Sequence, residues 1–175
     1  MRIRAAHRVL AVVAIGALGI VGCDRGSDNA KESSFEVGDY CVLIPAEKAS
    51  ELSGRVLGAP VPVAPSGDVQ GGCNWTAKLE AETDAVWNLN LTVFRGSDEG
   101  TSIDDLWANS IAGFNAQGID EEAVDGLGEE AFFGETPSGQ GQVSVRADDW
   151  VLQFSGQGVS KDAMVAFANE GLSQR

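Results

Sequence analysis

Two stretches of the chain alternate strictly between apolar and polar residues, and this pattern constrains the fold more than any other feature. The apolar positions are Cys73, Trp75, Ala77 and Leu79 in the first stretch and Trp87, Leu89, Leu91 and Val93 in the second. Alternation with a period of two is typical of half-buried antiparallel strands. The acidic segment 80–84 lies between them as a turn, so we expect the two strands to form a hairpin.

Three segments carry the signals of helices. Residues 45–54 begin with a proline, which fits a first helical turn, and end with a glycine, which fits a C-terminal stop. Ser102 and Asp105 have the spacing of a capping box ahead of apolar residues at helical spacing, which predicts a helix over 103–115. Ser160 is expected to cap a C-terminal helix. Its inward residues would be Met164, Phe167, Ala168 and Leu172.

The remaining segments complete an α+β pattern. Further strands are expected over 130–134, 142–147 and 150–155, while the proline-rich stretch 58–72 is expected to be a loop or an edge strand. This order predicts one antiparallel sheet with about three helices packed on one face. The two halves are loosely alike, each a helix followed by antiparallel strands, which suggests a two-fold pseudo-repeat without similarity between individual residues.

The first 22 residues have the composition of a signal peptide. A basic segment is followed by residues 9–21, which are all apolar or glycine and are too few to span a membrane as a helix. The segment ends Ile20-Val21-Gly22-Cys23, which resembles the lipobox of bacterial lipoproteins. The resemblance implies that Cys23 receives a diacylglyceryl group, that residues 1–22 are removed, and that the new N-terminus is acylated. An ordinary signal peptide followed by a chance cysteine is the alternative.

This interpretation divides the chain into three parts. Residues 1–22 would be the lipoprotein signal peptide, residues 23–36 the lipidated cysteine with a flexible polar tether, and residues 37–175 the folded domain. Two or more acyl chains hold a protein stably at a bilayer. We therefore expect the protein to be lipid-anchored on the extracytoplasmic face of the cell membrane.

Charge and histidine content exclude several classes of function. Removal of residues 1–22 takes away three arginines and no acid, so the net charge changes from −14 to −17, and the only histidine, His7, is lost. Binding of nucleic acid is excluded because it requires cationic surfaces. Catalytic triads and dyads built on histidine are excluded, as are histidine-ligated metal sites. We expect no enzyme activity, no cofactor and no metal.

Two cysteines remain in the predicted domain. Cys41 and Cys73 would lie in an oxidising compartment, where a pair of this kind is expected to form a disulfide. The alternative, a redox or metal-binding pair, lacks the C-x-x-C spacing and further ligands.

Cys41-Val-Leu-Ile44 and Cys73-Asn-Trp75 resemble two signatures of the DUF3558 family. Val124-Asp-Gly-Leu-Gly-Glu-Glu-Ala131 resembles a turn that several actinobacterial lipoprotein families share. The lipobox, the tether and the two-cysteine domain occur in the same order as in DUF3558, and the resemblance covers roughly residues 37–173. The threonine expected before the first helix is absent, with Pro45 near its place. The resemblance implies an actinobacterial cell-envelope lipoprotein. It carries no catalytic residues, because the family is a domain of unknown function.

Few residues stand out as candidate contacts. Phe132 and Phe133 are adjacent on a predicted strand, so one of them is expected to be exposed and to contact a partner or ligand. The four tryptophans are expected to lie in the core. Asn88, Asn90 and Thr92 form either a solvated face or a recognition face. Residues 97–104 gather oxygen donors that could hold calcium, but they lack the EF-hand spacing.

These observations favour a non-catalytic binding module of the cell envelope. Its partners would be the membrane, through the N-terminal lipid, and an unknown envelope protein or cell-wall component. The alternative is a small-ligand carrier or sensor that uses an apolar pocket between sheet and helices. An enzyme that relies on carboxylates alone is the least favoured hypothesis.

Overall fold

The computed structural model describes residues 40–77, 86–97 and 99–174. The expected signal peptide, the lipidated Cys23, the tether and the turn at 80–84 lie outside the described residues.

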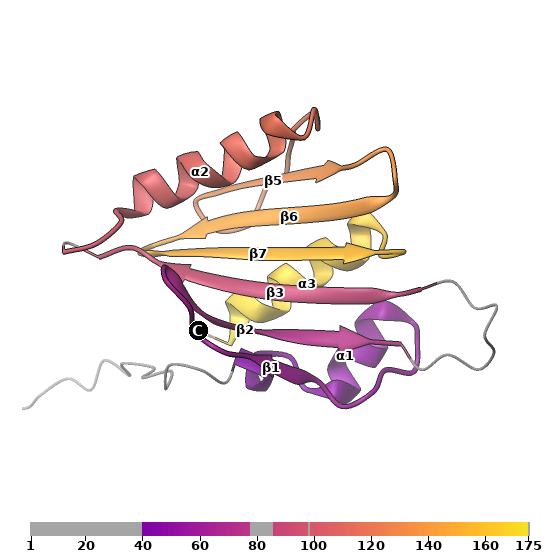
Figure 1. Ribbon diagram of the computed structural model, residues 1–175. Coiled ribbons are helices and arrows are strands. Elements are labelled where there is room, and N and C mark those ends of the chain that lie inside the picture. The colour runs from indigo at the N-terminus through magenta and orange to yellow at the C-terminus, as the bar shows by residue number, and fades with distance from the viewer. Residues whose placement is uncertain (1–39, 78–85, 98, 175) are drawn as a thin grey trace, which may run out of the picture. The chain divides into compact units, whose positions relative to one another are not determined.

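Seven strands form a single antiparallel sheet in the order β1-β2-β3-β7-β6-β5-β4 (Figure 1). The strands are β1 (Val61–Val63), β2 (Val69–Thr76), β3 (Asn88–Arg95), β4 (Glu122–Ala123), β5 (Glu130–Glu135), β6 (Gln140–Ala147) and β7 (Trp150–Gln157). The predicted hairpin is confirmed as β2 and β3, in which Trp75 pairs with Leu89. The proline-rich stretch supplies the short edge strand β1, where the missing N–H of Pro62 is tolerated.

The helices begin and end where their capping residues predict. They are the 3₁₀ helix η1 (Tyr40–Leu43), α1 (Ala46–Ser53), α2 (Ile103–Ala116) and α3 (Lys161–Ser173). Gly54 ends α1 in the left-handed conformation, with a φ of 65°. Ser102 and Ser160 each accept a hydrogen bond from the backbone N–H three residues later, at the starts of α2 and α3.

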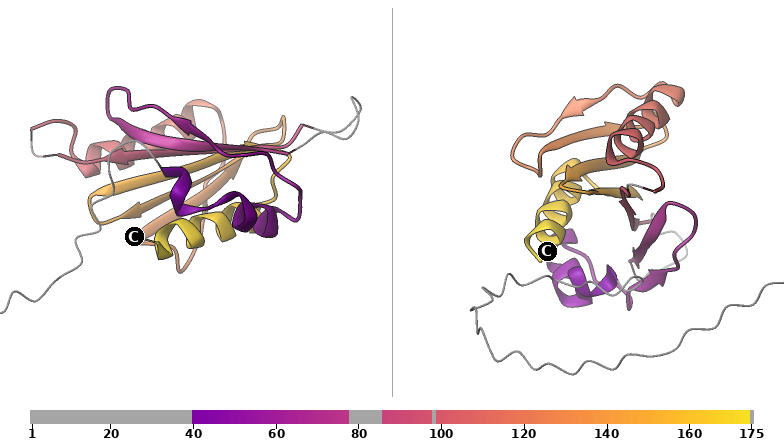
Figure 2. Two further views of the ribbon diagram at one scale, coloured as in Figure 1. Left: turned by 90° about the horizontal axis from the view of Figure 1, so that it is seen from below. Right: turned by 90° about the vertical axis from the view of Figure 1, so that its left-hand side faces the viewer.

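The helices occupy both faces of the sheet, so the expectation that they pack on one face is wrong (Figure 2). Helices α1 and α3 cover one face, where Ala49 and Phe167 contact the larger core cluster. Helix α2 covers part of the other face, where Trp107 packs with Phe132 and Val151. The physical reason is that β5 and β7 carry apolar residues on both sides, which gives the apolar stripe of α2 a surface to bury.

The order of the strands is compatible with the expected pseudo-repeat, but the placement of the helices is not. Each half runs from an edge strand to the centre, where β3 pairs antiparallel with β7. A two-fold axis that relates two antiparallel strands in this way is perpendicular to the sheet, so it would leave both preceding helices on the same face. Helices α1 and α2 lie on opposite faces, so the described segments do not have this symmetry.

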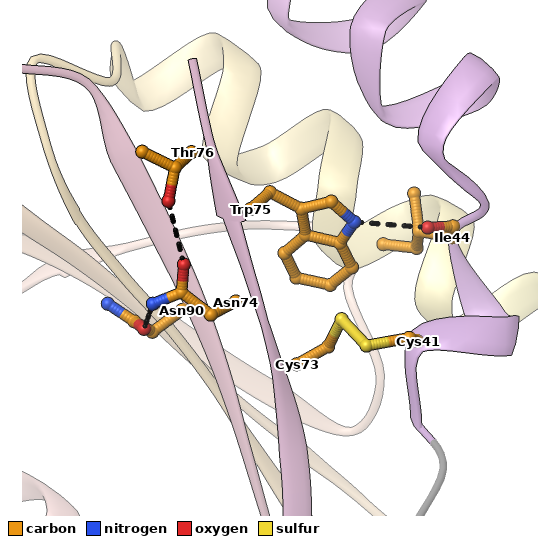
Figure 3. The surroundings of a disulfide bond; sticks show 7 residues. All are labelled: Cys41, Ile44, Cys73, Asn74, Trp75, Thr76 and Asn90. Atoms are coloured by element: carbon orange, nitrogen blue, oxygen red, sulfur yellow. Dashed lines mark hydrogen bonds between the residues drawn. A yellow bond between two sulfur atoms is a disulfide. The ribbon is translucent and has the colours of Figure 1, made fainter. Parts of the chain in front are cut away.

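The larger core is cross-linked at one edge of the sheet. The predicted disulfide is present between Cys41 in η1 and Cys73 in β2, with the two Cα atoms 5.0 Å apart (Figure 3). Beside it, the indole N–H of Trp75 donates a hydrogen bond of 3.2 Å to the carbonyl oxygen of Ile44. The ring of Trp75 meets Phe167 of α3 edge-on, at a centroid distance of 5.7 Å. The disulfide and the tryptophan together tie the N-terminal segment to the sheet.

Candidate binding face

Part of the sheet face that carries α2 has no described element packed over it. Helix α2 contacts Phe132 of β5, Val151 of β7 and Phe94 near the end of β3. Apart from Gly72, which pairs with Thr92, the outward positions of β2, β3, β7 and β6 beyond this cluster are polar and uncharged. We give the name amide face to eight of these residues: Asn74, Thr76, Asn88, Asn90, Thr92, Gln142, Gln153 and Ser155.

The strand register arranges the amide face in rows that cross the sheet. Asn74 pairs with Asn90, Asn90 with Ser155, and Ser155 with Gln142. These pairs belong to neighbouring strands, so their side chains lie on the same face and next to each other. Figure 3 shows Asn74 and Thr76 on the side of β2 away from Cys73 and Trp75. The face is therefore continuous over four strands.

Hydrogen bonds hold the side chains of this face in place. The amide of Asn74 donates to the side-chain oxygen of Asn90, and the hydroxyl of Thr76 donates to the oxygen of Asn74 at 3.0 Å (Figure 3). All members except Thr76 are half-buried between their neighbours. Side chains that are held in one conformation lose less entropy when they bind.

A pair of buried serines orients the amides nearest to α2. The hydroxyl of Ser110 in α2 donates to that of Ser144 in β6 at 3.1 Å, and both residues are buried. The amide of Gln153 donates to Ser110 at 2.6 Å, and the amide of Gln142 donates to Ser144 at 3.0 Å. The helix thus supports one border of the face through hydroxyl groups rather than apolar contacts.

Several groups on the face keep hydrogen-bonding capacity. Within the described parts of the chain, the side chains of Asn88, Thr92 and Ser155 make no side-chain hydrogen bond. Beyond Asn74, the edge strand β1 places Val61 on the same side of the sheet, and 60% of this residue is exposed. The face therefore combines unused amide and hydroxyl groups with an apolar border.

Phe132 and Phe133 do not form an exposed contact, and the expectation that one of them is exposed is wrong. Only 5% of Phe132 and 8% of Phe133 are accessible to solvent. Phe132 packs against Trp107 and Phe114 of α2, with centroid distances of 5.0 and 4.9 Å. Phe133 packs into the larger core on the other face. Helices on both faces of β5 bury both rings.

The tryptophans lie where the sequence predicts. Trp75, Trp87 and Trp107 are buried, and Trp150 is half-buried. The ring of Trp150 lies 4.9 Å from the guanidinium carbon of Arg95, whose Nε donates to Asp149 at 2.7 Å. Arg95 and Asp149 line an open polar cavity of about 610 Å³ together with Asp68 and Gln70.

Tyr40 lies near Arg95 at this end of the sheet. Its hydroxyl is buried and has no hydrogen-bond partner among the residues that the structure describes. Burial raises the pKa of Tyr40, and the positive charge of Arg95 opposes this increase.

The acidic residues do not assemble into a metal site in the described parts of the chain. No group of three or more His, Cys, Asp or Glu side chains there could hold an ion. Within the candidate calcium segment, Asp98 lies outside the described residues, and Asp104 accepts a hydrogen bond of 2.6 Å from Arg146.

The space between the sheet and helices α1 and α3 is filled with side chains. Trp75, Phe154 and Phe167 are fully buried there. An open apolar groove of about 460 Å³ lies at the margin of this layer, where Cys41, Val42 and Pro45 approach Pro60 and Pro62. The carrier hypothesis requires an apolar pocket inside the layer, and the packing of these residues does not favour one.

Comparison with models of known protein families gives no match, and comparison with curated proteins finds no relative. The resemblance to DUF3558 therefore stays a prediction. None of the helices in the described segments is long and apolar enough to cross a membrane.

The sequence identified five of the eight residues of the amide face. Asn88, Asn90 and Thr92, together with Asn74 and Thr76 at the polar positions of the first alternating stretch, were predicted to point away from the core, and they do. The contributions of Gln142, Gln153 and Ser155 were missed, because the alternation within a strand does not say which strand lies beside it. The serine pair was also missed, since Ser110 lies on the stripe of α2 that was expected to be apolar.

Proposed function

We propose that this protein is a lipid-anchored binding module on the extracytoplasmic side of the cell membrane and that its binding surface is the amide face. The observation that carries the proposal is a continuous face of half-buried, hydrogen-bonded amide and hydroxyl groups over which no described element packs. Recognition requires such polar groups in fixed positions, and the face provides them without any ionised side chain.

The N-terminal sequence supports the location. The short apolar segment ending at Cys23 matches a lipidation signal, and the acidic chain would be repelled by anionic lipid headgroups. A domain held away from the bilayer in this way keeps its sheet accessible to other components of the envelope. The Cys41–Cys73 disulfide suits the oxidising conditions outside the cytoplasm.

The location is tested by metabolic labelling with a palmitate analogue in a bacterial host that processes lipoproteins. We expect the full-length protein to be labelled and found in the membrane fraction, and Cys23→Ser to be unlabelled. Ser27→Ala is the matched control, since it changes a hydroxyl close to the proposed lipidation site, and it should behave like the original protein. Labelling of Cys23→Ser would contradict the proposal.

The binding surface is tested by placing a photo-crosslinking amino acid at Thr92, in the centre of the amide face. We expect a reproducible adduct of higher mass in intact cells. The same amino acid at Asn169, an exposed residue of α3 on the opposite side of the sheet, should give no such adduct. Identical adduct patterns at the two positions would count against the amide face as the binding surface.

A further inference from the structure

The chemistry of the amide face indicates which class of ligand it binds. This inference rests on the proposed function. We infer that this face binds a neutral, hydroxyl-rich carbohydrate chain that lies across β2, β3, β7 and β6. The inference stands on the charge of the face, the arrangement of its groups and the apolar strip at its border.

The charge of the face favours a neutral ligand. An anionic ligand requires cations, and four of the five basic residues in the described segments form ion pairs with carboxylates elsewhere. These four are Lys48, Arg95, Arg146 and Lys161. The net charge of −14 also repels polyanions at a distance. A cationic ligand would find its partners among the many carboxylates of the surface rather than on the amide face, which has none.

The functional groups of the face match hydroxyl groups. A hydroxyl donates one hydrogen bond and accepts others, and an amide side chain offers both a donor and an acceptor. Asn90 illustrates the match, because its oxygen accepts from Asn74 while its NH₂ group makes no hydrogen bond to a described side chain. A purely apolar partner would desolvate these amides without replacing their hydrogen bonds, at a cost of about 1–3 kcal/mol for each buried group.

The geometry suits an extended chain. Neighbouring strands are about 4.8 Å apart, so the row from Asn74 through Asn90 and Ser155 to Gln142 extends over roughly 14 Å. Successive sugar units that lie across the strands would each meet an amide or a hydroxyl. At the end of this row, the exposed Val61 presents an apolar surface to which the C–H groups of a sugar ring can pack.

The experiment is affinity electrophoresis of the full-length protein in a detergent that has no sugar headgroup. The gels contain the neutral polysaccharides mannan, galactan or dextran, or the anionic polygalacturonate. We expect at least one neutral polysaccharide to retard the protein. The anionic polygalacturonate should bind at least tenfold more weakly.

Asn90→Asp is the decisive variant. A carboxylate can still accept the hydrogen bond from Asn74, but it removes the NH₂ donor and adds a charge to the face. We expect it to weaken binding of the neutral polysaccharide at least tenfold. Asn169→Asp makes the same chemical change on α3 and should leave binding unchanged. Ser155→Ala removes one hydroxyl without adding charge and should weaken binding severalfold. Weaker binding by this second variant would show that the loss in Asn90→Asp does not come from a folding defect.

The outcomes separate this inference from the proposed function. Retardation by polygalacturonate alone, or equal retardation of Asn90→Asp and Asn169→Asp, would overturn the carbohydrate inference. If no polysaccharide binds but a crosslinker at Thr92 captures a protein, the inference fails while the proposed binding surface stands. If no polysaccharide binds and no crosslink forms, both fail.

Discussion

The two faces of the sheet are covered to different extents. The face under α1 and α3 carries apolar residues from β2 across to β5, and its core reaches the disulfide at the edge of the sheet. The face under α2 is apolar where β3, β5 and β7 approach the helix. Beyond that point lies the amide face, and the exposed Val61 of β1 borders it.

The difference shows what limits a helix on a sheet. A helix packs only as far as the strands present apolar side chains, because burial of an amide without a partner costs free energy. The serines Ser110 and Ser144 mark the border, where α2 still lies on the sheet but makes polar contacts. The covered face stabilises the domain, and the open face remains accessible for binding.

The largest expected effect tests whether the covered face dominates stability. Phe167→Ala in α3 removes a fully buried ring from the larger core, and we expect it to lower the free energy of unfolding by about 4–5 kcal/mol. Phe114→Ala in α2 removes the same ring from the smaller cluster, and we expect a loss of about 3 kcal/mol. Urea denaturation measures both. Equal losses, or a larger loss for Phe114→Ala, would contradict the comparison.

The second prediction concerns the cross-link on the covered face. The paired substitution Cys41→Ser and Cys73→Ser removes the cross-link between two residues that are 32 positions apart in the chain. The chain-entropy model gives a loss of about 3.7 kcal/mol, because the unfolded chain becomes less restricted. The thermal midpoint of the domain, measured with and without reductant, checks this value. The double variant should lose its sensitivity to reductant, and a midpoint equal to that of the oxidised protein would refute the prediction.

A smaller effect is expected at the border of the open face. Ser110→Ala removes the acceptor of Gln153 and the donor to Ser144, which should lower the free energy of unfolding by about 1–2 kcal/mol. Asn109→Ala, at the exposed neighbouring position of α2, is the control and should change stability by less than about 0.5 kcal/mol. Equal effects in urea denaturation would show that the serine pair does not support the helix.

The smallest expected effect is a decrease in stability at alkaline pH, which arises from a residue on the covered face. Burial raises the pKa of Tyr40, so the folded state favours the neutral phenol more than the unfolded state does. The resulting stabilisation is present below the unfolded pKa of about 10 and is lost as the pH rises through the higher folded value. Tyr40→Phe should remove this dependence.

Tyr40 can be titrated directly, because it is the only tyrosine in the chain. The near-ultraviolet absorbance of tyrosinate should give a pKa above 10 in the folded protein. A value at or below that of a free tyrosine would contradict the predicted direction. At neutral pH, Tyr40→Phe should be neutral or slightly stabilising, since it removes a buried hydroxyl that has no described partner.

The sequence by itself determined the local elements of this protein. The alternation around Trp75 and Leu89 specified the central hairpin, and the serines at 102 and 160 specified the starts of α2 and α3. Such signals act within a few residues, where backbone conformation and side-chain period are coupled directly. The count of two cysteines in the domain was enough to predict the disulfide.

The tertiary structure alone decided which face each helix occupies and which strands share the amide face. Both choices depend on contacts between segments that are far apart in the chain, such as Trp107 with Phe132 or Asn90 with Ser155. Adjacent apolar residues at 132–133 and 151–152 indicate burial on both sides of a strand, but not which helix provides it. The candidate binding surface is therefore a product of strand order, because four strands had to come together before their polar sides formed one face.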